Sequence, residues 1–465
     1  MTIYKSQVYI QNTKVNFIKL FKHPWEDRMK KSLIQLLLSA STCLAMMATS
    51  PVLAGDYEGV TIDAKLIGGQ QYEGLYALIS NWESATGAKV NIVSKKNHFE
   101  LDREFKSDIA AGTTDWCVGS NHSSFAPQYP SLYTDMSPYN NADQLAGFIP
   151  AMIKSSTIGG RLVMLPRAQF DVSVLYYQVS LYEDASNQSA YKAKFGVDLA
   201  PPITLNEFKQ QAIFFADPPN FYGTQYAGKD EGAAGRFYEM VVANGGAMFN
   251  ADFTPAFNSD AGRESLQWFV DLYEAGAVPP GTTSYLWDEL GAGFASGTIG
   301  INLDWPGWSG YFNDPEASKA SGNVGITVQP MGSAGIHTGW SGFHGFSVTE
   351  DCANKEAAAS LVTFLTSEAS QIAESAGGSL PTRSSVWDVV VAAADGDEYR
   401  TMALNAFKEG AKHAFAVPQT EYWIEATNLI FPELQAAILG DKTVDEALQD
   451  ASDAVDEMMQ ENGVY

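Results

Sequence analysis

The alternation of strand-like and helix-like segments in this 465-residue chain limits its possible folds more than any other feature. Short apolar or alternating runs, which predict strands, are separated by segments whose apolar residues recur at helical spacing. The expected strands lie at 60–69, 88–94 and 115–120, and the expected helices lie between them at 75–87 and 101–112. Strands joined by helices in this way predict a mostly parallel, doubly wound α/β sheet.

Loops at one edge of such a sheet are the first candidates for a site. Ligands of open α/β sheets bind outside the carboxyl ends of the strands. Loops 68–74 and 119–125 follow the first and third expected strands, and we therefore expect functional side chains there.

The rest of the chain continues the alternation without a repeat, a low-complexity segment or an obvious linker. Residues 160–178 predict two strand-like runs broken at Arg167–Asp171, and a capping box of Thr204 and Glu207 starts a helix within 201–216. Further helices are expected at 259–276, 354–378 and 443–460, and further strands at 298–305 and 324–332. The chain length predicts two domains, and the continuity favours two α/β lobes that exchange segments more than once.

Charge is distributed unevenly along the chain. The 29 Lys and Arg and 54 Asp and Glu include 7 and 2, respectively, in residues 1–54, which leaves 22 against 52, or −30, for the remainder. Such a surface repels nucleic acid and anionic lipid, so we expect no nucleic-acid partner. Beyond residue 54 no run of 18 apolar residues occurs, so this part is expected to be soluble.

The first 54 residues have the features of an export signal. The basic start at 29–31 precedes a short apolar segment at 33–47, and 52–54 supplies small residues for cleavage. We assign 1–54 to a signal peptide, with Met29 as an alternative translation start. Export predicts a periplasmic location and an oxidising compartment.

Three cysteines are present, and only two follow the signal segment. Cys43 lies inside the signal segment in a poor context for lipid attachment, so we expect no lipid anchor. Cys117 and Cys352 allow one disulfide, but we expect them to be small buried hydrophobic residues instead.

Sequence motifs of common enzymes and metal sites are missing or incomplete. Residues 223–229 match G-x4-G-K, but Asp230 stands where a phosphate-binding loop needs Ser or Thr. There is no H-E-x-x-H, no cysteine pair at zinc spacing and no G-x-S-x-G turn. The sequence therefore predicts no cofactor, no metal ion and no catalytic residue.

A set of short motifs follows a recognisable order. They are NWESATGAKV (81–90), LPRAQFDVSVLYYQ (165–178), PPITLNEF (201–208), AGAVPPGTTSYLWDELGAGFASGTIGINLDWPGW (275–308), NKEAAASLVTFLTS (354–367), GGSLPTR (377–383) and TVDEALQDA (443–451). In this order the chain resembles family 1 of the extracellular solute-binding proteins, the maltose-binding-protein-like carbohydrate receptors of ABC importers.

The resemblance implies a type II-like periplasmic binding protein with two α/β lobes joined by a multi-segment hinge. The N-terminal lobe is expected at 55–170 and 332–382, and the C-terminal lobe at 171–331 and 383–465. The chain is expected to cross near Asp171, Val328–Gly332 and Leu380–Arg383. The lobes close on a mono- or oligosaccharide, which a monomeric protein delivers to the permease subunits at the inner membrane.

The resemblance also implies ligand-binding residues. Sugars combine apolar C–H faces with rings of hydroxyls, so they need aromatic faces and planar polar groups. Trp305 matches the position of a ring that stacks on sugar in the family, and Trp308 and Asp304 are beside it in INLDWPGWSG (301–310). Asp171 occupies the position of an acidic contact at the hinge.

Further candidates are weaker matches. Asn121 and His122 end a strand in a loop that carries polar contacts in the family, and His122 replaces an acid there. Trp340 enters a glycine-rich strand, and Arg383 lies near the third crossing. The remaining candidates rest on position alone: Tyr72, Gln71, Tyr222, Arg236 and Tyr238. His344 is expected to be structural.

Two alternatives remain open from sequence. A secreted glycoside hydrolase also combines paired carboxylates with tryptophans, and Asp171 with Asp304 could be such a pair. A binder of a polyol or a glycerol-phosphate-type ligand is closer to the resemblance, although the candidate loops contain few cations besides Arg167, Arg236 and Arg383.

Overall fold

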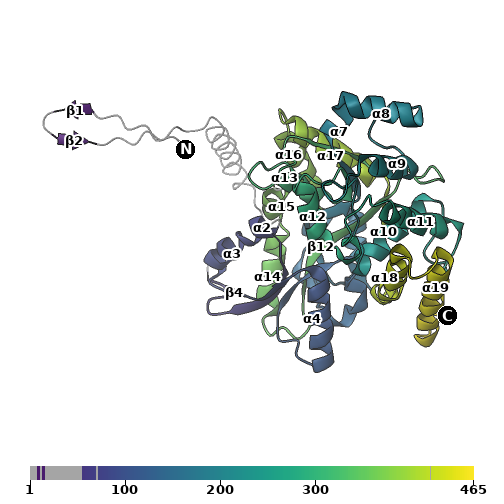
Figure 1. Ribbon diagram of the computed structural model, residues 1–465. Helices are drawn as coiled ribbons and strands as arrows, with labels where there is room; N and C mark the ends of the chain where they lie inside the picture. Colours follow the sequence, from purple (N-terminus) through teal and green to yellow (C-terminus); the bar gives the residue numbers. More distant parts are fainter. Residues whose placement is uncertain (1–7, 11–12, 16–54, 70–71, 377, 419) are drawn as a thin grey trace. The chain divides into compact units, whose positions relative to one another are not determined.

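The computed structural model describes residues 8–10, 13–15, 55–69, 72–376, 378–418 and 420–465. The chain divides into two compact units, Met1–Leu53 and Ala54–Tyr465. In the first unit, strand β1 (Val8–Ile10) pairs antiparallel with β2 (Thr13–Val15) (Figure 1). The rest of the predicted signal peptide, including Cys43, lies outside the described residues, as does Gln71.

A six-stranded sheet forms one half of the second unit. Its strands are β3 (Thr61–Ile67), β4 (Lys89–Lys96), β5 (Val118–His122), β8 (Leu165–Val172), β12 (Gly339–Val348) and β13 (Ala414–Ala416). The order is β13-β12-β5-β3-β4, and β8 also pairs with β12. The first three strands are parallel as predicted, whereas β12 runs antiparallel to both β5 and β8.

A three-stranded sheet forms the other half. It consists of β9 (Val174–Gln178) between β10 (Ile301–Asp304) and β11 (Val324–Val328), and both pairings are antiparallel. The chain passes from the large sheet to the small one at Ser173, between β8 and β9, and returns through residues 329–338. The lobe boundaries stay a prediction; β13, from the predicted C-terminal lobe, pairs in the large sheet.

The expected strand break at Arg167–Asp171 is wrong. Strand β8 continues through these residues, although its pairing with β12 shifts register between Pro166 and Phe170. The chain leaves β8 at Ser173, whose N–H donates to the Trp340 carbonyl at 3.0 Å. Arg167 is tolerated inside the sheet because it forms a buried ion pair with Glu374, with Nε to Oε1 at 2.8 Å. A buried charge that has a partner need not end a strand.

The helices pack around both sheets (Figure 1). Their bounds are α2 (Glu73–Tyr76), α3 (Ile79–Thr86), α4 (His98–Ala111), α5 (Ala142–Ala146), α6 (Pro150–Ser155), α7 (Val179–Glu183), α8 (Ala185–Phe195), α9 (Leu205–Phe215), α10 (Asp230–Ala243), α11 (Asp260–Glu274), α12 (Trp287–Ala295), α13 (Ser309–Phe312), α14 (Lys355–Leu365), α15 (Glu368–Ser375), α16 (Ser384–Ala393), α17 (Glu398–Ala411), α18 (Trp423–Leu439) and α19 (Val444–Glu461). A two-stranded pair, β6 (Thr157–Ile158) and β7 (Arg161–Leu162), completes the described strands.

Local signals account for several helix ends. The predicted capping box of Thr204 and Glu207 is present at the start of α9. The single helix expected at 354–378 is wrong, because α14 ends at Leu365 and the side chain of Ser367 caps a new helix, α15. No helix among the described residues is both long enough and apolar enough to cross a membrane.

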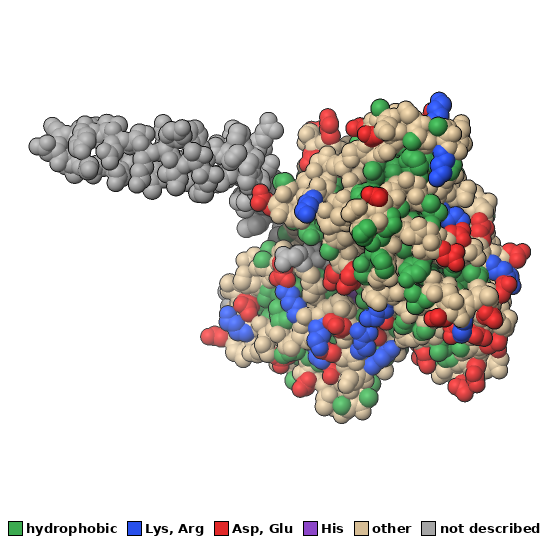
Figure 2. Space-filling model, viewed as in Figure 1, with side chains coloured by type: hydrophobic (Ala, Val, Ile, Leu, Met, Phe, Trp, Pro, Cys, Tyr) green, Lys and Arg blue, Asp and Glu red, His purple; other side chains and the backbone are tan. Residues whose placement is uncertain are grey.

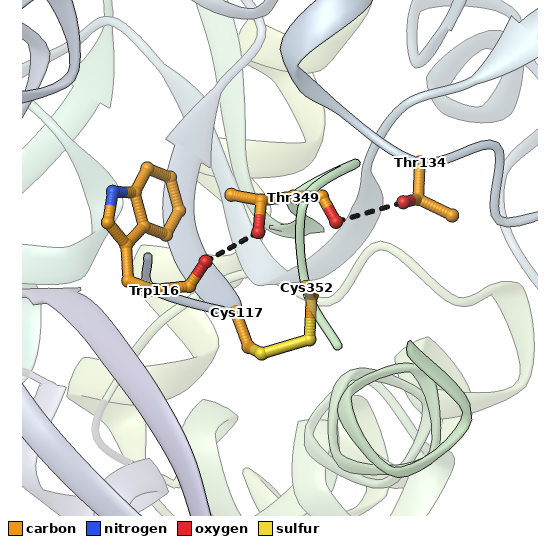
Figure 3. The surroundings of a disulfide bond; sticks show 5 residues. All are labelled: Trp116, Cys117, Thr134, Thr349 and Cys352. Atoms are coloured by element: carbon orange, nitrogen blue, oxygen red, sulfur yellow. Dashed lines mark hydrogen bonds between the residues drawn. A yellow bond between two sulfur atoms is a disulfide. The ribbon is translucent and has the colours of Figure 1, made fainter. Parts of the chain in front are cut away.

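Cys117 and Cys352 form a disulfide, which corrects the expectation of two free buried cysteines (Figure 3). Strands β5 and β12 are antiparallel neighbours with Val118 opposite Val348, so the start of one meets the end of the other. This pairing brings the two Cα atoms to 4.8 Å although the cysteines are 235 residues apart. Thr349 reinforces the junction by donating to the Trp116 carbonyl.

Candidate functional site

A cavity of about 300 Å³ is lined by segments from both halves of the second unit. The large sheet contributes residues at the carboxyl ends of β3 and β5, residues within β8 and β12, and the start of α4. The other side contributes the starts of α10 and α12 and the turn after β10. The lining residues used below are Gly68, Tyr72, His98, Glu100, His122, Gln169, Asp171, Lys229, Glu231, Trp287, Asp288, Glu289, Trp305, Trp308, Trp340, Gly342 and His344.

Three tryptophans form one wall of the cavity. The ring centroids of Trp287 and Trp305 are 5.2 Å apart, those of Trp305 and Trp340 are 5.0 Å apart, and those of Trp287 and Trp340 are 5.9 Å apart. Trp305 and Trp287 are only half-buried, so parts of their rings face the cavity. Trp308 also lines the cavity and stacks on Phe312.

The turn that carries Trp305 is fixed through its backbone. The Trp305 N–H donates to Asp304 Oδ1 at 2.9 Å, and Tyr176 Oη donates to the Trp305 carbonyl at 2.8 Å. Asp304 itself is fully buried and also accepts from Asn302 Nδ2 at 2.9 Å. Burial raises the pKa of Asp304 to about 7, although the Trp305 N–H and Arg236 lower it. Asp304 therefore positions the turn from behind and does not line the cavity.

Arg236 supports the same wall from inside the protein. Its guanidinium carbon lies 5.4 Å from the Trp305 ring and 5.7 Å from the Trp340 ring. Glu239 and Ser173 hold the guanidinium in place through buried hydrogen bonds. Helix α10 approaches Trp340 closely at Gly235, where a Cβ atom would lie 2.2 Å from the indole.

The opposite wall contains histidines and polar groups. His344 Nε2 lies 3.5 Å from Asp171 Oδ2, and the ring centroids of His122 and His344 are 4.7 Å apart. His98 packs against both histidines, at 6.0 Å from His122 and 5.7 Å from His344. Burial lowers the pKa of His98 to about 3 and that of His122 to about 4, and it lowers the pKa of His344 well below the usual value. These imidazoles are neutral at pH 7 and can both donate and accept hydrogen bonds.

Two carboxylates of the cavity have raised pKa values. Burial raises the pKa of Asp171 well above its usual value, with Arg167 opposing the rise. Burial raises the pKa of Glu231 to about 7, although Trp423 Nε1 and Ser124 Oγ donate to its two oxygens. Both groups are suited to hydrogen bonding with a neutral polar ligand.

The structure brings six of the predicted site residues to the cavity wall: Tyr72, His122, Asp171, Trp305, Trp308 and Trp340. It places five others away from this wall: Asn121, Tyr222, Arg236, Tyr238 and Arg383, in addition to the buried Asp304. Asn121 bonds Ser347 Oγ and the His122 N–H. Arg383 donates to the carbonyls of Thr366 and Gln144 and lies 3.7 Å from the Phe148 ring.

The remaining two candidates make contacts with the protein interior. Tyr222 is half-buried, and its backbone pairs with Ile299. Tyr238 packs on the rings of Phe415 and Trp423, with centroids at 5.1 and 5.8 Å.

Sequence reasoning missed several lining residues. His98 starts α4 directly after β4, whose carboxyl end lies at the same sheet edge as the two loops that were considered. The rule that ligands bind outside the carboxyl ends of the strands, applied to all three parallel strands, would have identified His98. Trp287 begins α12 and reads in the sequence as an ordinary apolar helix residue, and no local signal distinguishes it.

Comparison with known proteins identifies the family. The family model for bacterial extracellular solute-binding proteins matches residues 68–372, which is more than half of the chain. The chain belongs to this family. The predicted resemblance and fold class are thereby confirmed.

Curated relatives are more distant. A "Probable ABC transporter-binding protein" of Deinococcus radiodurans is 27% identical over 239 residues, covering 50% of this chain and 54% of the relative. A "Probable amino-acid ABC transporter periplasmic-binding protein" of Sinorhizobium fredii is 27% identical over 283 residues, covering 60% of this chain and 62% of the relative. The match thus spans less than two thirds of each relative.

Solved structures of this solute-binding protein family share the fold. A maltose-bound MalE3 of T. maritima superposes with a TM-score of 0.76 at 24% identity, covering 86% of this chain and 100% of that one. A solute-binding protein of Agrobacterium radiobacter in complex with ribitol gives 0.74 at 21% identity, covering 86% and 99%. At these identities the likeness establishes the two-lobed fold.

Proposed function

We propose that this solute-binding protein binds a carbohydrate or a polyol in the cavity and delivers it to an ABC permease. The observation that carries the proposal is the pairing of two chemically different walls. Trp287, Trp305 and Trp340 offer aromatic faces, while His122 and Asp171 offer polar hydrogen-bonding groups opposite them. A sugar presents apolar C–H faces on one side and hydroxyls around its rim, so it complements both walls.

The charges of the cavity favour a ligand that is not an anion. Among the described lining residues, Lys229 is the one Lys or Arg side chain, against five carboxyl side chains. A phosphorylated polyol would need several cations near its phosphate. Arg167, Arg236 and Arg383 do not supply them, because each is buried and bonded within the protein.

The arrangement of the two candidate aspartates supports binding without catalysis. Glycoside hydrolysis needs two carboxyl groups that flank one bond of the substrate. Asp171 lines the cavity, but Asp304 is fully buried behind Trp305 and bonded to its backbone. We propose that the protein performs no covalent chemistry on its ligand.

Export and hinge motion belong to the same proposal. The buried Cys117–Cys352 disulfide is the kind of bond that persists in an oxidising compartment, which supports a periplasmic location after removal of residues 1–54. Segments from both sides of the cavity contact one ligand only when the lobes are closed. We place the lobes at 55–170 with 332–382 and at 171–331 with 383–465, in a monomer.

A ligand screen tests the proposal. The purified protein would be melted in the presence of monosaccharides, oligosaccharides, polyols and amino acids at millimolar concentration, because a ligand of the native state raises Tm by mass action. We expect a shift with at least one carbohydrate or polyol. A shift with amino acids alone would overturn the proposed ligand class, and turnover of an oligosaccharide would overturn the proposed absence of catalysis.

The tryptophan wall is tested by substitution. Trp305→Ala removes the stacking surface and should weaken binding of the identified ligand by about 2 kcal/mol, roughly 30-fold in Kd. Trp387, half-buried on α16 and absent from the cavity wall, provides the matched control Trp387→Ala. Isothermal titration calorimetry measures both, and equal affinities for the two variants would remove Trp305 from the binding site.

A further inference from the structure

The structure brings together three metal-ligating side chains that are far apart in sequence. His122 ends β5, Asp171 lies on β8 and His344 lies on β12. Each offers one ligand atom, and these atoms all lie within 4.8 Å of one another. We propose that His122, Asp171 and His344 bind a divalent transition-metal ion of the Zn²⁺ class on the wall of the cavity. The proposed metal site shares His122 and Asp171 with the polar wall of the cavity, and it is tested with the ion alone.

Strand register holds the three groups on one face of the sheet. His344 stands directly opposite His122 across the antiparallel β5–β12 pair. Asp171 stands opposite Gly342, two residues before His344, across the β8–β12 pair. Because residues two apart on a strand point to the same face, the three side chains converge. Ligands carried by three neighbouring strands are positioned by backbone hydrogen bonds and need no mobile loop.

The surroundings of His122 are those of a metal-binding histidine. Its Nδ1 lies 2.6 Å from Ser124 Oγ, which lies 3.1 Å from Glu231 Oε2. The Ser124 N–H also donates to Nδ1 at 3.2 Å, so metal binding at Nε2 requires the tautomer in which Nδ1–H donates to Ser124 Oγ and Ser124 Oγ donates to Glu231. Metal-ligating histidines commonly donate their other ring N–H to a carboxylate or to a group bonded to one.

A glycine on β12 makes room for the His122 imidazole. A Cβ atom at position 342 would lie 2.6 Å from His122 Nε2 and 2.7 Å from its Cε1. Any larger residue at Gly342 would therefore displace the His122 imidazole from its place beside Asp171 and His344. Strand β12 has a glycine at this point and a histidine two residues further on.

Gln169 provides an independent indication of a missing partner. It is 8% exposed, lines the cavity and lies two residues before Asp171 on β8. Its Nε2 donates to Tyr72 Oη, but its Oε1 has no hydrogen-bond partner among the described residues. A buried oxygen without a partner is costly, and a water held by the ion, or the ion itself, would supply one.

The donor set selects the class of ion. Two imidazoles and one carboxylate suit Zn²⁺, Co²⁺ and related divalent ions, whereas Ca²⁺ and Mg²⁺ prefer oxygen ligands alone. The ligand atoms lie up to 4.8 Å from one another. Metal–ligand bonds of about 2.0–2.2 Å require the two atoms that are furthest apart to approach each other by side-chain rotation. Three protein ligands leave at least one coordination position, and it faces the cavity.

Calorimetric titration of the metal-free mature protein with ZnCl₂ tests the proposal. We expect one site per chain, and we expect His344→Gln and His122→Gln each to weaken it by more than about tenfold. His413, which packs on His337 near Glu409 outside the cavity, provides the matched control. His413→Gln should leave Zn²⁺ affinity unchanged.

Two further measurements distinguish loss of the metal site from misfolding of a variant. The Tm of each metal-free variant reports its fold, and the visible absorption of bound Co²⁺ reports nitrogen and oxygen ligation directly. Absence of saturable Zn²⁺ binding would overturn the proposal. So would equal affinity in His344→Gln, His122→Gln and the wild type, or loss of the site in His413→Gln.

Discussion

Glu231 should make the stability of this protein fall as pH rises from about 4.5 to about 7. The side chain is 4% exposed, and burial raises its pKa from 4.5 to about 7. Asp102 adds to the rise, whereas hydrogen bonds from Trp423 and Ser124 oppose it. The folded state therefore binds more protons than the unfolded state between these two values.

The size of the effect follows from the two pKa values. A pKa rise from 4.5 to about 7 corresponds to about 3 kcal/mol. Below pH 4.5 Glu231 does not lower the free energy of unfolding, because the carboxyl is protonated in both states. As the pH rises the carboxyl ionises first in the unfolded state, and above pH 7 the free energy of unfolding is lower by about 3 kcal/mol. Glu231→Gln removes the titration. The amide can still accept from Trp423 Nε1, and it can donate to Ser124 Oγ while that hydroxyl donates to His122 Nδ1.

Urea unfolding of the wild type and of Glu231→Gln at a series of pH values measures this directly. The difference in unfolding free energy should be below about 0.5 kcal/mol near pH 4.5 and should rise to about 3 kcal/mol in favour of the variant near pH 8. Glu425→Gln, on the exposed surface of α18, controls for the loss of one negative charge. This control matters because carboxylates are spread widely over the visible face in Figure 2. A difference for Glu231→Gln that does not change with pH would refute the reasoning.

Two other predictions concern the scaffold and the tryptophan wall. Replacing Cys117 and Cys352 together by Ala should lower the free energy of unfolding in urea by about 3–5 kcal/mol, because the disulfide closes a long loop; an unchanged midpoint would contradict this. Gly235→Ala would place a Cβ atom 2.2 Å from the Trp340 indole, so the ring must move and ligand affinity should fall by about tenfold. Calorimetry would contradict the second prediction by finding wild-type affinity.

Local sequence signals predicted several of the described strands and helices. The strand at 60–69 became β3, and the capping box at Thr204 started α9, because period and capping act within a few residues. The break expected at Arg167–Asp171 failed for a tertiary reason. Glu374, 207 residues away, pairs with Arg167 and lets β8 continue.

The predicted site residues also divide into those that local sequence signals identified correctly and those whose position depends on tertiary contacts. Trp305 and His122 were found because each follows a strand at the expected edge, and both line the cavity. Asp304 lies next to Trp305 in sequence but is turned inward by the twofold alternation of strand β10. Its hydrogen bonds to Asn302 and to the Trp305 backbone cannot be read from spacing alone.

The sequence by itself determined the alternating α/β elements and the family, because these depend on local pattern and motif order. Only the tertiary structure decided which side chains share a wall of the cavity. The Cys117–Cys352 disulfide and the cluster of His122, Asp171 and His344 both depend on the antiparallel partners that β12 finds in β5 and β8. Strand pairing over such distances is fixed by packing of the whole chain, and no short segment encodes it.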